Sequence, residues 1–288
     1  MKRSLVEDEG GAVYAEFLIA FPPMLMMFLA MLQLGLMYSA RLSVRHAAYR
    51  ATRAAVVVIP DNPDNYGGEN TYRIDYDSSG TGSGDPSGLV GMAMGKGSAR
   101  LKAIRFAATM PLLGFAPNLG RMSGEESLAD TLGGDTVDTF AGGLYGIAAT
   151  SVTFPEEPAS MSFRETFDRN EMVTTRVTYM MTCTMPIVTR EPFNMCSAPL
   201  DFIIAAPDVV FEGLAGTIGG DVVDPWTELG FDTYRDWLRG REDMANGVEE
   251  MRFANWTLLA PFMLADQRFV ILRAEASMPM QGAEYDFR

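Results

Sequence analysis

The sequence predicts an α+β fold, in which a long N-terminal membrane-spanning helix leads into a domain built from an antiparallel sheet and packed helices. Three observations support this. Residues 17–38 contain no charged side chain, residues 40–59 continue with helical spacing, and the later strand-like and helix-like segments lack the regular βα order of a parallel sheet. We divide the chain into a leader-like stretch (residues 1–11), the helix (12–59) and an acidic domain (60–288) with a loop-rich insertion near 60–97.

The apolar run FLIAFPPMLMMFLAMLQLGLMY begins at Phe17. A helix of about 22 residues reaches about 33 Å, enough to cross the hydrocarbon core of a bilayer with some tilt. A soluble core helix is rarely apolar on every face for so long. A cleaved secretory signal would have its small-residue cut site after the run, whereas here Gly10 and Gly11 precede it. Pro22 and Pro23 predict a kink.

The helix is expected to continue beyond the membrane and to end at Pro60. At 100° per residue, small side chains gather on one side of residues 40–59 and four arginines on the other. Small residues allow close approach of a second element, which has two interpretations: contact with a neighbouring subunit, or packing on the chain's own domain. The candidate assembly residues are Val44, Ala47, Ala48, Ala51 and Ala55, together with Glu16 and Phe17 at the membrane end; the opposite side carries Arg41, Arg45, Arg50 and Arg53.

The domain contains both helix-like and strand-like segments. Residues 98–113, 233–238 and 244–259 have helical spacing, whereas residues 150–154, 172–185 and 269–278 have the alternation and β-branched content of strands. Residues 71–76 are a further strand candidate inside the insertion.

Cys183 and Cys196, the only two cysteines, flank the segment TMPIVTREPFNM. A disulfide closing so short a loop would stabilise the fold by about 2.5–3 kcal/mol and would persist outside the cytosol. The alternative is a pair of buried free thiols.

Composition excludes several function classes. The net charge is −14, and the basic residues lie mainly near the span, so no basic face is available for nucleic acid. The chain lacks GxSxG, P-loop, HExxH and CxxC motifs, and its one histidine, His46, lies away from any cysteine or carboxylate cluster. We therefore expect no enzymatic activity and no cofactor.

Two similar segments, LADTLGGDTVD and LAGTIGGDVVD, each place two aspartates behind a Gly-Gly pair. Asp135 with Asp138, and Asp221 with Asp224, are weak candidates for Ca²⁺ ligands. The interpretation that we favour is a glycine-ended helix whose following aspartate caps the next one, with no metal bound.

The segment EGGAVYAEFLIAFPPML resembles the start of the TadE-like minor pilins (pseudopilins) of tight-adherence, or Tad/Flp-type, pili. Two later segments, residues 174–188 and 268–282, resemble that family loosely. The resemblance implies a prepilin-type leader cut after Gly10–Gly11, a mature chain beginning at Ala12, and a Glu16 that pairs with the new N-terminus of a neighbouring subunit. It also implies a structural role in assembling an adhesion pilus.

The implied partners are other pilin or minor pilin subunits, a prepilin peptidase and the bacterial inner membrane, with the domain in the periplasm and incorporation into an extracellular pilus. The arginines that follow the span conflict with this topology, because the positive-inside rule alone would place the domain in the cytoplasm. The alternatives are an uncut membrane-anchored receptor or Ca²⁺-binding adhesin, and a tethered hydrolase.

Overall fold

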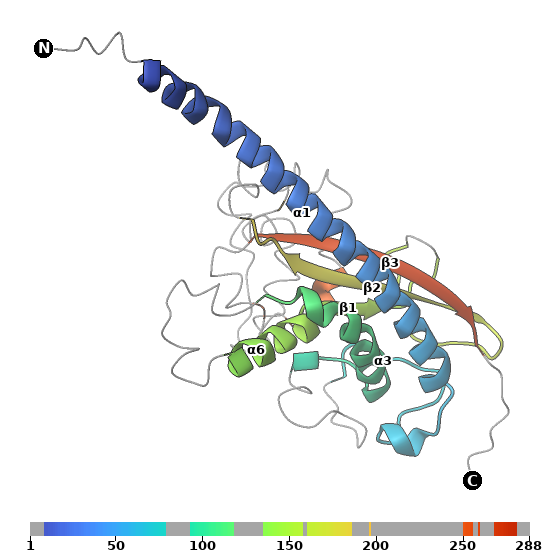
Figure 1. The fold of residues 1–288 in the computed structure, drawn as a ribbon. Coiled ribbons are helices and arrows are strands. Elements are labelled where there is room, and N and C mark those ends of the chain that lie inside the picture. The colour runs from blue at the N-terminus through green and yellow to red at the C-terminus, as the bar shows by residue number, and fades with distance from the viewer. Residues whose placement is uncertain are drawn as a thin grey trace, which may run out of the picture.

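The computed structural model describes residues 9–78, 93–117, 135–157, 160–185, 196, 250–255, 259 and 268–280. Within these ranges the chain forms a long N-terminal helix, a three-stranded sheet and shorter helices packed around them (Figure 1). The predicted α+β class is confirmed.

Helix α1 (Glu9–Val58) is a single helix of 50 residues. It continues through Pro22 and Pro23 without interruption and ends just before Pro60, as the sequence predicts. Its N-terminal part projects away from the rest of the protein, whereas its C-terminal part lies across the sheet (Figure 1).

The sheet is antiparallel, with the strand order β1-β2-β3. Its strands are β1 (Thr150–Thr153), β2 (Met172–Thr182) and β3 (Phe269–Pro279), close to the three expected segments. Residues 71–76 differ from the expectation, because they form only an isolated bridge between Arg73 and Thr166 rather than a strand. The side chains of β2 alternate between the two faces of the sheet, so Thr175 faces α1 and Arg176 faces the opposite side.

Helix α3 (Ala99–Thr109) and the 3₁₀ helix η2 (Met110–Phe115) confirm the helix expected at residues 98–113. Ser98 caps α3, because its side chain accepts a hydrogen bond from the backbone N–H of Leu101 (3.2 Å). The described part also contains η1 (Pro63–Tyr66), α6 (Asp135–Ala148) and η3 (Met251–Phe253). The helix expected at 233–238 lies outside the described residues, as does most of the one expected at 244–259.

The core lies between α1, the face of the sheet that it covers, and α3. Alanines supply much of the α1 side of this core, and larger side chains fill the sheet side, including Val177, Tyr179 and Phe154. The small residues bring the helix axis close to the strands, which fixes the direction in which α1 leaves the domain.

Candidate membrane-insertion and assembly site

The N-terminal part of α1 carries an apolar surface that the domain leaves uncovered. Ile19, Met24 and Tyr38 are 76%, 70% and 67% exposed. From Phe17 to Leu25 every side chain is exposed, so this stretch is apolar on all sides. In the described residues α1 is the one helix long and apolar enough to cross a membrane. A surface of this size in water is strongly unfavourable, and lipid or other apolar helices would cover it.

Glu16 lies at the N-terminal end of this surface, directly before Phe17. Its side chain is exposed, and the adjacent rings of Phe17 and Phe21 stack with their centroids 5.0 Å apart. The backbone of Gly10, Gly11 and Ala12 belongs to the first turns of α1. The structure thus places the expected cleavage point and Glu16 on one helix, and their roles remain predictions.

Farther along α1, the stripe of small residues is already occupied. Val44, Ala47, Ala48, Ala51 and Ala55 are fully buried. They pack with residues of β2, β3 and α3 in one core cluster. The packing agrees with the second of the two interpretations, because the chain's own domain covers all five side chains. Contact of these residues with another subunit stays a prediction.

A pair of threonines fixes this docking. Thr52 of α1 and Thr175 of β2 share a hydrogen bond through their hydroxyl groups. The Thr52 hydroxyl also lies 2.8 Å from the carbonyl oxygen of Ala48 and 3.1 Å from that of Ala276, while Thr175 lies 3.3 Å from the Ala48 carbonyl. Because these groups are buried, each unmade bond would leave a polar atom without a partner. Hydroxyl groups therefore set the position of the helix along the sheet, and the sequence pattern did not single them out.

The C-terminal end of α1 is held by a buried arginine. Arg100 of α3 donates from Nη1 to the carbonyl oxygens of Val58 and Ile59, and from Nη2 to those of Asp61 (2.9 Å) and Glu69 (3.3 Å). The last carbonyls of a helix lack intrahelical partners and carry a partial negative charge, which a guanidinium neutralises. Sequence reasoning missed this contact, because a lone arginine in a helical segment gives no sign of what it caps.

The other face of the sheet contains a buried ionic cluster. Glu250, which is 0% exposed, accepts hydrogen bonds from Arg176 (2.6 Å), Thr178 (2.5 Å) and Arg273 (3.2 Å). Arg176 also donates to Glu275 at 2.7 Å. The two arginines lie against this buried carboxylate, and removing one member of the cluster would leave a buried charge unpaired. These residues lie far apart in the sequence, so no local spacing pattern could predict that they form a cluster.

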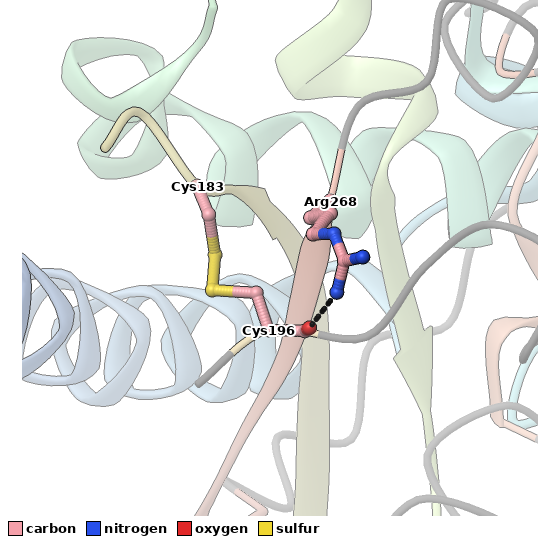
Figure 2. The surroundings of a disulfide bond; sticks show 3 residues. All are labelled: Cys183, Cys196 and Arg268. Carbon is pink, nitrogen blue, oxygen red and sulfur yellow. Dashed lines mark hydrogen bonds between the residues drawn. A yellow bond between two sulfur atoms is a disulfide. The ribbon is translucent and has the colours of Figure 1, made fainter. Parts of the chain in front are cut away.

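The predicted Cys183–Cys196 disulfide is present, and its Cα atoms are 6.6 Å apart. Cys183 follows the end of β2, and its backbone N–H donates to the carbonyl oxygen of Arg268 (2.8 Å). Figure 2 shows the Arg268 side chain reaching back to the carbonyl oxygen of Cys196 at 3.4 Å. The disulfide therefore joins Cys196 to the end of β2, and the hydrogen bonds of Arg268 hold both cysteines beside the start of β3.

No cluster of potential metal ligands occurs in the described part of the chain. Helix α6 begins at Asp135 and includes Asp138, which fits the expectation that a helix follows the first Gly-Gly pair; their side chains are not described. Asp221 and Asp224 lie outside the described residues.

The N-terminal segment therefore combines three features. It has an exposed apolar surface, a glutamate at the end of that surface, and a C-terminal half of α1 that is docked on the domain. Residues 11–53 match the family of TadE-like proteins. The match covers the apolar surface and most of the docked half of α1, and it confirms the resemblance inferred from the sequence for this part of the chain. No curated protein and no solved structure matches the chain.

Proposed function

We propose that the chain is a minor pilin of a Tad-type pilus, cut after Gly11 and held in the inner membrane by α1 until it joins a pilus. The observation that carries the proposal is the division of α1 into two parts. Residues 17–25 expose apolar side chains on every face, whereas the part that follows Ala40 buries one face against the domain. The family match over residues 11–53 supports this role, since it spans both parts.

In this proposal Glu16 serves assembly. A carboxylate within hydrocarbon is costly, about 2.5–3.5 kcal/mol at mid-bilayer, and needs an opposite charge. Cleavage after Gly11 would create that charge at Ala12 of a neighbouring subunit. The partners are then a prepilin peptidase and other pilin subunits, with the domain in the periplasm. The disulfide supports this placement, because such bonds persist in oxidising compartments.

The test of processing is N-terminal sequencing of protein recovered from membranes. We expect Ala12 as the first residue of the wild type and an uncut chain for Gly11→Leu. Gly35→Leu is the matched control on the same helix, because a Cβ at Gly35 meets nothing within 4 Å. An intact leader on the wild-type protein would contradict the proposal and favour the uncut, membrane-anchored receptor.

The test of assembly is Glu16→Val. The substitution makes the span more apolar, so the protein should remain in the membrane fraction after carbonate extraction. We expect cells carrying it to lose the protein from sheared pili. Wild-type amounts in the pilus fraction would refute the role of Glu16 and leave the processing result unaffected.

A further inference from the structure

A groove of about 740 Å³ lies between α1 and β3, close to where α1 leaves its apolar segment. We call it the α1–β3 groove. Its helix side consists of Arg41, Arg45 and Tyr49, and its strand side is the run from Ile271 to Glu275, with Arg176 behind it. Four of the nine described residues that line it are arginines, in a chain with 37 acidic and only 23 basic residues, so the groove is an unusual concentration of positive charge.

The arginines of the groove fall into two groups. Arg176 and Arg273 belong to the ionic cluster, where Glu250 and Glu275 balance them. Arg41 and Arg45 are exposed, and among the described residues neither has an ion pair or hydrogen bond. The glutamate that lines the groove accepts its hydrogen bond from Arg176, so its charge does not balance those of α1.

The spacing of the helix side suits a single small anion. Arg41, Arg45 and Tyr49 are four residues apart in succession, so they lie on one face of α1 with neighbouring Cβ atoms about 6 Å apart. A guanidinium binds phosphate oxygens with two parallel hydrogen bonds, and a phenol hydroxyl can add a third donor.

The strand side adds backbone donors. Among the described strands β3 pairs only with β2, so its other edge faces away from the sheet. The backbone N–H of Cys183 donates to Arg268, and that of Met280 donates to Glu171. With the register of β2 and β3, these two bonds show that the even-numbered residues of β3 direct their backbone N–H and C=O groups toward β2. The alternate residues, which include Ile271 and Glu275, therefore turn their N–H groups outward along the groove.

We propose that the α1–β3 groove binds an anionic phosphoryl group through Arg41, Arg45 and Tyr49. Two sources have this chemistry: the headgroup of an anionic phospholipid, and a free phosphate. The position of the groove favours the lipid. Arg41 lies three residues beyond Tyr38, which is about 5 Å along the helix and within the headgroup layer if the span ends there. This proposal is independent of the pilus role.

The test uses the full chain in uncharged maltoside micelles, titrated separately with dihexanoylphosphatidylglycerol and with inorganic phosphate. We expect saturable binding that weakens at least tenfold in the double variant Arg41→Gln/Arg45→Gln. The matched control is Arg50→Gln/Arg53→Gln, which removes the same charge from exposed positions of the same helix outside the groove. Its affinity should equal that of the wild type.

The two ligands distinguish the sources. Tighter binding of phosphatidylglycerol than of phosphate identifies a lipid site, and equal affinities identify a phosphate site. Three results would overturn the proposal: no binding of either ligand, equal weakening in both double variants, or binding restricted to a Glu-rich peptide added as a third ligand. The last result would instead identify β3 as an edge for an acidic protein strand.

Discussion

Replacing Ala48 by leucine tests whether α1 docks on its own sheet. Ala48 is fully buried, and its carbonyl oxygen accepts hydrogen bonds from Thr52 and Thr175. Burying three more carbon atoms could stabilise the fold by about 0.8 kcal/mol each, but only where space exists. Here the helix must move away from the strands, and overpacking of this kind costs about 1–3 kcal/mol. The movement also weakens the threonine contacts, each worth about 1 kcal/mol.

We therefore expect Ala48→Leu to lower the free energy of unfolding by about 2–3 kcal/mol, which corresponds to a decrease in Tm of about 4–10 °C. The assay is thermal unfolding of the full chain in micelles, followed by tryptophan fluorescence and repeated at tenfold dilution. His46→Leu, an exposed position on the same helix, is the control and should change stability by less than about 0.5 kcal/mol. An unchanged Tm for Ala48→Leu, or a decrease that depends on concentration, would show that the stripe contacts another subunit and would refute the reasoning.

Two further predictions concern stability. Cys183→Ala/Cys196→Ala should lower the free energy of unfolding by about 3 kcal/mol, measured by urea unfolding, and reductant should then have no added effect; a reductant-sensitive variant would contradict this. Tyr179→Phe should raise the free energy of unfolding by about 1 kcal/mol at pH 7, because the Tyr179 hydroxyl is buried without a hydrogen-bond partner among the described residues. Burial also raises the pKa of Tyr179 above the ordinary 10.0, so the wild type loses stability as the pH rises past about 10, and the advantage of the variant should grow there. Tyr145→Phe is its control, since that hydroxyl donates to Met180 at 2.8 Å and its loss should destabilise the fold.

Local patterns predicted the elements of this fold well and their contacts poorly. The apolar run, the end of the helix at Pro60 and the three strands each follow from residue types within a short window. The small-residue stripe was visible too, but its partner was not, because alanines permit close approach to any surface. The disulfide could be predicted, since two cysteines allow only one intramolecular pair. The Arg100 cap and the Glu250 cluster could not, since both depend on chain segments brought together only by folding.

The hydrogen bonds within the docked part of α1 and at its C-terminal end have a mechanical consequence. A pull along the helix axis, from a neighbour that holds the apolar end, must shear α1 over the sheet. The Thr52–Thr175 pair and the four carbonyl contacts of Arg100 lie at different points along that path and would be strained together. The domain and its anchor should therefore transmit tension as one rigid body, so that a load on the apolar end reaches the sheet without first unwinding the helix.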